Sequence, residues 1–325
     1  MSPASSPVSA AVSAAVSASV RAPVRHLPAP TTLRAHLHAM RFTLARRMVQ
    51  LGMLVCFYGT LHWGWKVFGQ PLLTGDLSAA KLLGTLPLAD PLAALQILAA
   101  GHPLVTEILI GVAVTLGVYA ALGGRVFCGW VCPMNIVTDV AAWLRGKLGL
   151  ADAPDLVTLP ARTRYGVLVL ALVVSAIAGV AAFEAFSPIA MLHRELIYGA
   201  GLGLSAALGI LLLDTLVLRR GWCGHLCPLG AFWALAGRGG LVKVAFDDAS
   251  CTRCGDCVRA CPEPQVLHFN TVAARGMVAS GECTSCGRCV AVCPEDSLKF
   301  DLRLRIHAAA PQRARGAPPV SGGSS

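Results

Sequence analysis

The chain has 325 residues, of which 55% are hydrophobic and only 14% are charged. This composition excludes a disordered polar chain and is typical of a membrane protein. The formal net charge of +10 does not indicate a nucleic-acid partner, because six arginines precede residue 48 and no acidic residue precedes Asp76. Basic residues in a tail and in helix flanks are typical of contact with anionic lipid. We therefore expect membrane lipid, and no nucleic acid, as a partner.

Both ends of the chain have the composition of unstructured tails. Residues 1–40 are rich in Ala, Ser, Val and Pro and contain no acidic residue. Such a segment cannot bury a core, so it is predicted to be a disordered low-complexity tail, and the same prediction holds for residues 307–325. An acid-poor start with arginine and serine also fits an organelle transit peptide.

Four long apolar segments follow the first tail, near residues 48–66, 104–122, 166–184 and 199–218. A hydrocarbon core of about 30 Å needs roughly 20 helical residues. Residues 41–238 are therefore predicted to hold four transmembrane α-helices, arranged as two repeated hairpins. Lysine and arginine in the loop 123–164 place that loop, both termini and the C-terminal region in the cytoplasm. A further stretch, Leu82–Ala100, is interrupted by prolines and is predicted to be interfacial or re-entrant.

Two cysteine motifs, one after each predicted hairpin, share the pattern Arg-x-x-Cys-Gly-x-x-Cys-Pro. Their cysteines are Cys128 and Cys132 in the first motif and Cys223 and Cys227 in the second. A parallel internal repeat would bring the four thiols together. They are candidates for a third metal or cluster site or for a redox-active thiol group, and the alternative is that they only pack. A disulfide is disfavoured in a reducing compartment.

The C-terminal part repeats a Cys-x2-Cys-x2-Cys-x3-Cys-Pro run, which is typical of proteins that hold iron–sulfur clusters. In such paired runs the fourth cysteine of each ligates the cluster of the other. The expected ligands of two [4Fe-4S] clusters are Cys251, Cys254, Cys257 and Cys293 for one, and Cys283, Cys286, Cys289 and Cys261 for the other. Structural zinc is the alternative, although zinc prefers two separated Cys-x2-Cys pairs. Residues 243–306 are predicted to form a ferredoxin-like α+β domain.

These features together resemble the NapH family of ferredoxin-type membrane proteins over about residues 41–306. The resemblance implies a quinol dehydrogenase subunit of the bacterial inner membrane that passes electrons towards a periplasmic nitrate reductase. It also implies a NapG-like periplasmic iron–sulfur protein and a c-type cytochrome as partners. MauN, NosR and CcoG share the cysteine architecture but have other functions. The flavin-bearing region of NosR and the extra C-terminal domain of CcoG have no counterpart here, which favours a NapH-like interpretation.

Quinol oxidation releases protons, and ionisable groups in apolar segments are the default acceptors. The candidates are Glu107, Glu184, Asp214 and His225. Each also has a simpler interpretation, since carboxylates near helix ends usually reach water and His225 can cap its loop. Two other functions stay open: a CcoG-like factor for oxidase maturation or metal handling, and a passive membrane anchor for a ferredoxin.

Overall fold

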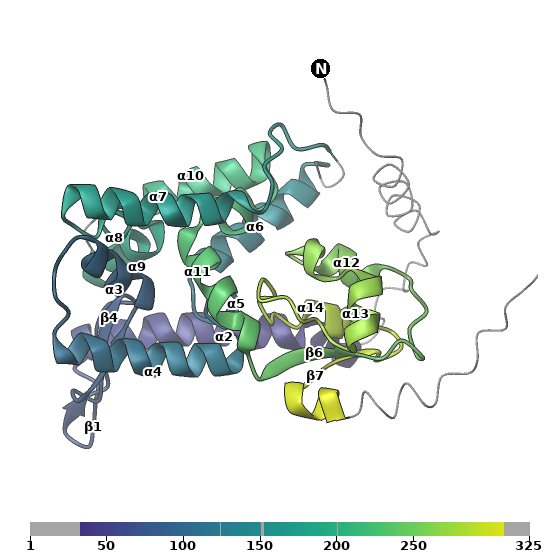
Figure 1. Ribbon diagram of the computed structural model, residues 1–325, viewed down its shortest axis with the longest axis horizontal. Helices are drawn as coiled ribbons and strands as arrows, with labels where there is room; N and C mark the ends of the chain where they lie inside the picture. Colours follow the sequence, from purple (N-terminus) through teal and green to yellow (C-terminus); the bar gives the residue numbers. More distant parts are fainter. Residues whose placement is uncertain (1–32, 124, 151–152, 200, 309–325) are drawn as a thin grey trace, which may run out of the picture.

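The computed structural model describes residues 33–123, 125–150, 153–199 and 201–308. Residues 1–32 and 309–325, where the sequence predicts tails, lie outside this part of the chain. Figure 1 shows a larger helical region in contact with a smaller C-terminal region that contains the repeated cysteine runs. Residues 33–40, which the sequence predicts to be part of the tail, belong to the first described helix.

The larger region is mostly helical. Its α-helices are α2 (Leu33–His62), α3 (Pro91–Ala99), α4 (Thr106–Leu122), α5 (Val126–Trp130), α6 (Met134–Lys147), α7 (Thr163–Ala178), α8 (Ala182–Phe186), α9 (Pro188–Tyr198), α10 (Gly203–Leu212) and α11 (Pro228–Ala236). Shorter turns complete it, namely the π-helices η1 (Leu213–Val217) and η2 (Gly221–Leu226) and the 3-10 helix η3 (Gly237–Gly239).

Two small antiparallel sheets follow α2. One pairs β1 (Lys66–Val67) with β2 (Gln70–Pro71), and the other has the order β3 (Leu73–Gly75), β4 (Ala79–Leu82), β5 (Leu86–Ala89). The stretch Leu82–Ala100 thus forms the end of β4, then β5 and α3. Its prolines explain this division: Pro87 lies in the edge strand β5, and Pro91 occupies the first turn of α3. The Asp90 carboxylate caps α3 by accepting a 3.0 Å bond from the N–H of Leu92.

The prediction of four transmembrane helices is not supported. Across the described residues, no helix combines the length and apolar character needed to cross a membrane. The helices end early: α4 has 17 residues, and α7 has 16 before the left-handed Gly179. The fourth segment divides, since α10 has 10 residues and continues as the π-helix η1. Although α2 has 30 residues, Arg41, Arg46 and Arg47 interrupt its first half.

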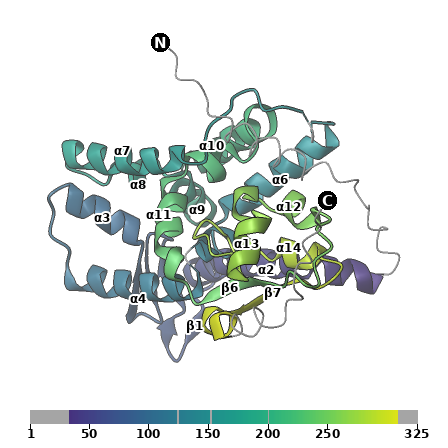
Figure 2. The same cartoon turned by 45° about the vertical axis from the view of Figure 1, so that its right-hand side comes forward.

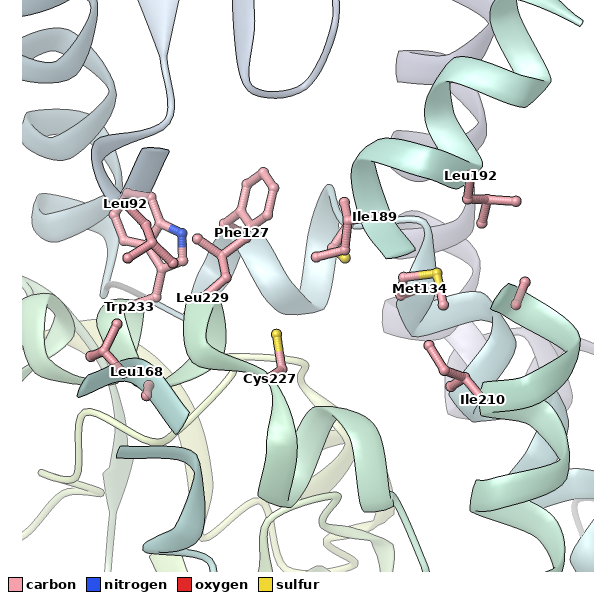
Figure 3. Packing of buried hydrophobic residues seen from close by; sticks show 13 residues of the cluster. Leu92, Phe127, Met134, Leu168, Ile189, Leu192, Ile210, Cys227, Leu229 and Trp233 are labelled. Atoms are coloured by element: carbon pink, nitrogen blue, oxygen red, sulfur yellow. The ribbon is translucent and has the colours of Figure 1, made fainter. Parts of the chain in front are cut away.

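A large hydrophobic cluster joins α3, α5, α6, α7, α9, α10 and α11. Figure 3 shows Cys227 within this cluster, with Phe127 and Leu229 to one side and Ile189 and Met134 to the other. A cysteine of the second motif thus lies among core side chains from both repeated halves.

The C-terminal region is built on an antiparallel pair, β6 (Val242–Phe246) with β7 (Leu298–Leu302). These strands flank the two cysteine runs in the chain, so their pairing brings the start of the first run near the end of the second. The remaining elements are α12 (Asp256–Ala260), η4 (Pro264–Val266), α13 (Phe269–Arg275) and α14 (Arg288–Val292), followed by a helical turn at 303–308. Figure 2 shows α12, α13 and α14 grouped near β6 and β7, with α2 close by. This is the α+β arrangement predicted for residues 243–306.

Candidate metal centres

The two C-terminal runs fold into loops of the same conformation. Arg253 and Gly255 have positive φ angles of 54° and 81°, and the equivalent Ser285 and Gly287 have 49° and 74°. A left-handed conformation costs a residue other than glycine about 1–2 kcal/mol, so its repetition at Arg253 and Ser285 indicates a functional constraint. Such loops turn successive N–H groups inwards, forming the concave nests found at many iron–sulfur sites. In the first loop the N–H of Arg253 donates to Sγ of Cys251, 3.4 Å away.

The structure brings the expected cysteines into two sets. One cavity is lined by Cys261, Cys283, Cys286 and Cys289. The other is lined by Cys251, Cys254, Cys257 and Cys293. Within the described ranges, no three His, Cys, Asp or Glu side chains gather as they would around a single metal ion. A cubane has another requirement, because each of its four thiolates binds a separate iron, and both sets fit that donor pattern.

The two loops differ in their exposure to solvent. Residues 284–287 of the second run are all buried, whereas Thr252 and Arg253 of the first are exposed. Burial raises the pKa of the Cys257 thiol to about 11 and that of Cys261 to about 12. Thiolates at these positions therefore need nearby positive charge, which iron supplies when a cluster is bound.

The two Arg-x-x-Cys-Gly-x-x-Cys-Pro motifs meet inside the larger region. Cys128 lies in α5, with Cys132 just after it; Cys223 lies in η2, and Cys227 precedes α11. Their thiols are close enough to influence one another's ionisation, since Cys223 interacts electrostatically with the other three. Cys132 and Cys227 are only 4% and 5% exposed. The convergence expected for these four cysteines is therefore present in the fold.

The surroundings of these four cysteines disfavour a free thiolate, because they raise the pKa of each thiol. Burial, followed by neighbouring thiolates, raises the pKa of Cys132 and Cys223 well above the usual range. Burial raises the pKa of Cys227 to about 12, and at Cys128 it outweighs the opposing effect of the Arg125 guanidinium. Reactive redox thiols usually have a lowered pKa. A four-sulfur donor set too open for a single metal ion instead suits an iron–sulfur cluster, in which each thiolate binds a separate iron.

Arg125, at the head of the first motif, connects both motifs to the C-terminal region. Its buried guanidinium donates to the carbonyl of Cys223 (3.1 Å), the carbonyl of Glu282 (3.0 Å) and the carboxylate of Glu263 (2.8 Å). Arg164 pairs with the same Glu263 carboxylate at 3.2 Å and with that of Glu282 at 2.8 Å. Because Glu263 follows the fourth cysteine of the first run, this network joins the two kinds of cysteine site.

Asp139 of α6 forms a second charged hub. Its carboxylate pairs with Arg288 at 2.6 Å, Arg220 at 3.0 Å and Arg46 at 3.7 Å, and also with Arg47. The sequence analysis did not identify Asp139, nor Glu263, whose carboxylate is bound by Arg125 of the first motif. The available signal was the arginine that begins each motif, because a cation held beside buried cysteines requires an acidic partner.

The helix α5 contacts the second C-terminal run directly. The indole N–H of Trp130 donates to the carbonyl of Ser285, 2.9 Å away. A Cβ atom at Gly129 would lie 2.7 Å from the carbonyl oxygen of Thr284. The glycine of the first motif is therefore needed for the close approach of the two backbones.

Replacing Gly129 by alanine is expected to destabilise this contact by about 1–3 kcal/mol, because the added methyl group overpacks the interface. The equivalent Gly224→Ala is the matched control, since a Cβ there would meet its nearest atom at an ordinary 3.7 Å. Thermal unfolding and amide hydrogen exchange over residues 283–286 measure the effect. Equal behaviour of the two variants would contradict the close contact of α5 with this loop.

The four expected proton-handling residues do not gather at one site. Glu107 is exposed on α4 and pairs with Lys81 at 2.9 Å. Glu184 lies in α8, which contains none of the motif cysteines. Asp214 and His225 line one cavity of about 670 Å³ between η2 and the C-terminal region. The lining of this cavity includes five arginines and three carboxylates beside apolar residues.

Two family models match the chain. A model described as "4Fe-4S binding domain" matches residues 104–151 and again residues 200–246. A model described as "4Fe-4S dicluster domain" matches residues 243–294. The first covers the two motifs that contain Cys128 and Cys223, and the second covers both C-terminal runs.

Curated relatives match over most of the chain. The "Methylamine utilization ferredoxin-type protein MauN" of Methylobacillus flagellatus is 42% identical over 72% of this chain and 81% of its own length. The "Ferredoxin-type protein NapH" of Haemophilus influenzae is 43% identical over 71% of this chain and 78% of its own. NapH of Escherichia coli is 42% identical over 70% and 77%. No solved structure matches the chain.

Proposed function

Because the chain belongs to the family of ferredoxin-type iron–sulfur proteins that includes NapH and MauN, we propose that it is an electron-transfer subunit that oxidises quinol. The electrons pass through [4Fe-4S] clusters towards a periplasmic reductase system. The observation that carries this proposal is that a convergent group of four cysteines is linked, through Trp130 and Ser285, to one of two cavities that are each lined by four cysteines.

Three cysteine sets hold the clusters in this proposal. The two C-terminal sets take the ligands expected from the exchanged fourth cysteine, and the four motif cysteines hold a third centre. Support for the third centre comes from the family model described as a 4Fe-4S binding domain, whose two segments contain these four cysteines and end before Cys251. A bound cluster supplies one-electron transfer, while the chain provides the thiolates, the loop N–H groups and the surrounding ion pairs.

The contacts among the sites suggest the order of transfer. The motif cysteines are joined to the second C-terminal run by Arg125 and Trp130, so the set with Cys283 comes next. The set with Cys251, whose loop is exposed at Thr252 and Arg253, exchanges electrons with the set that contains Cys283. Short steps between neighbouring centres replace one long transfer through the protein.

We propose that the protein works at the bacterial inner membrane with its C-terminal region on the cytoplasmic side. Exposed apolar side chains on two helices support contact with lipid: Val169, Leu170 and Ile177 on α7 are 60%, 60% and 82% exposed, and Leu204 and Leu208 on α10 are 57% and 54% exposed. A NapG-like iron–sulfur protein and a c-type cytochrome complete the route to nitrate reductase in this proposal. This chain is as similar to the MauN relatives as to the NapH relatives, so a separate assay must identify the protein that accepts its electrons.

The test is electron paramagnetic resonance, with iron and sulfide counting, on anaerobically purified protein before and after quinol addition. Three clusters give about twelve irons per chain, and two give about eight. Quinol is expected to change the cluster spectrum. A spectrum that responds to dithionite but never to quinol, even with the periplasmic partner present, would overturn the proposal.

Changing all four motif cysteines to serine is expected to remove about four irons per chain and to abolish reduction by quinol. The C-terminal clusters should still be reduced by dithionite. Cys56→Ser is the control, because Cys56 lies in α2 outside all three sets and should keep the full iron content. An unchanged iron count in the fourfold variant would rule out the third centre.

A further inference from the structure

A largely apolar cavity of about 420 Å³ lies beside the first cysteine motif. Its walls come from α2, the sheet β3–β5, α4 and α5, and they include Phe57, Tyr119, Phe127 and Trp130. This volume falls within the range typical of small-molecule pockets, which combine apolar and aromatic walls with a few polar groups. No residue predicted from the sequence as a quinol ligand lines it.

The cavity reaches the first cysteine motif itself. Phe127 and Val131 in its wall are each one residue before a motif cysteine, Cys128 and Cys132. Tyr119 is near enough to Cys128 for the two side chains to interact electrostatically. A ring bound against these residues would therefore lie next to the proposed third centre.

Two polar side chains in the wall suit a ligand that carries hydroxyl groups. The hydroxyl oxygen of Thr115 is buried and has no hydrogen-bond partner in the described part of the chain. The Oδ1 atom of Asp76 accepts 2.9 Å bonds from the N–H groups of Ser78 and Ala79, which leaves Oδ2 as the second acceptor. An unpartnered buried hydroxyl costs free energy that a ligand hydrogen bond would recover.

The cavity also has an apolar opening through which a hydrophobic ligand can enter. Val118 and Leu122 of α4 line the cavity and are 50% and 43% exposed. Leu109 and Ile110, on the same helix, are 50% and 47% exposed, so the opening belongs to an apolar surface. The cavity beside Asp214 and His225 differs, because its arginines and carboxylates would lose hydration against an apolar ring.

We propose that the cavity between α4 and α5 is the binding site for the ring of a lipophilic quinol, with Thr115 hydrogen-bonding a ring hydroxyl and Asp76 accepting a proton. This assignment rests on the proposed function. The quinol loses two electrons and two protons to become the quinone. The electrons pass one at a time to oxidised [4Fe-4S] clusters, one proton goes to the Asp76 carboxylate, and the other goes to water.

Binding of a short-chain quinone to the purified protein tests the site directly, through quenching of tryptophan fluorescence to which Trp130 contributes. Val118→Phe is expected to weaken binding about tenfold or more by filling the opening. Thr115→Val is expected to weaken it about fivefold by removing one hydrogen bond. Ile110→Phe is the matched control, because Ile110 is equally exposed on α4 but does not line the cavity. If Val118→Phe and Thr115→Val both bind like the wild type and like Ile110→Phe, the assignment is wrong.

The role of Asp76 needs a separate variant. Asp76→Asn keeps an oxygen for the N–H groups of Ser78 and Ala79, so the turn should persist. We expect unchanged quinone binding, unchanged cluster reduction by dithionite, and reduction by quinol about a hundredfold slower. If quinol reduces the clusters of this variant at the normal rate, Asp76 is not the proton acceptor. If binding follows the cavity variants but quinol never reduces the wild-type clusters, the site stands and the proposed function fails.

Discussion

Replacing Glu263 by alanine is expected to lower the stability of the protein by about 3–5 kcal/mol, the cost of leaving buried cations unpaired. Glu263 is 5% exposed, and Arg125 and Arg164, whose guanidinium groups share its carboxylate, are 1% and 0% exposed. Arg164 keeps Glu282 as a partner, whereas Arg125 would retain the carbonyls of Glu282 and Cys223 and the thiol of Cys128, none of which is a carboxylate. Thermal unfolding at constant cluster content should show a midpoint roughly 10 °C lower.

The chain provides a matched control for this substitution. Glu295 occupies the same place in the second run, after Cys293-Pro294, but it is exposed. Glu295→Ala should therefore change stability by no more than about 0.5 kcal/mol. Glu263→Gln, which retains shape and one acceptor, should fall between the two. If Glu263→Ala and Glu295→Ala behave alike, the buried ion network does not hold the two regions together.

Replacing Asp139 by alanine is expected to have an effect of similar size, about 3–5 kcal/mol, for a different reason. Its carboxylate is 10% exposed and lies among four arginines from α2, α14 and the head of the second motif. Without it, like charges from three parts of the chain would repel one another in a place with little water. Asp248→Ala is the control, since the Asp248–Arg253 pair is exposed and worth about 0–1 kcal/mol.

The pKa of Asp139 also predicts how the stability of the protein depends on pH. Burial alone would raise the pKa of this carboxyl, but the surrounding arginines outweigh it and lower the pKa below its usual range. Its contribution is therefore complete above the unfolded-state pKa of about 3.9 and is lost as the pH falls through the lower folded-state pKa. The wild type should lose its advantage over Asp139→Asn in acid-unfolding curves below about pH 4. A constant difference across that range would contradict the assignment.

The cysteine spacing predicted the grouping of side chains better than hydropathy predicted the helices. The repeated runs anticipated that Cys261 and Cys293 would each join the set of the other run, because that exchange follows from the spacing alone. Hydropathy found the apolar segments but not their ends. The left-handed Gly179 and the π-helix at Leu213 depend on local backbone geometry that an average over twenty residues does not register.

Predictions for the electron donor site went less far, since they considered charge and position in the chain only. Glu107 and Glu184 do not line the cavity proposed for quinol, which is marked by Thr115 and Asp76 instead. A threonine in an apolar helix gives no signal in the sequence, because its unpartnered hydroxyl becomes evident only when the surrounding side chains are placed. Likewise, nothing in Cys-Pro-Glu distinguishes the buried Glu263 from the exposed Glu295.

The placement of Arg125 and Arg164 makes the ferredoxin-like segment a poor stand-alone module. A fragment cut before residue 243 would keep Glu263 and Glu282 but lose both of their guanidinium partners. It would also lose Phe42, which covers the left-handed Gly287 of the second loop. The part of the chain that looks most like a small soluble carrier thus depends on the remainder for its charge balance and for the shielding of one cysteine set.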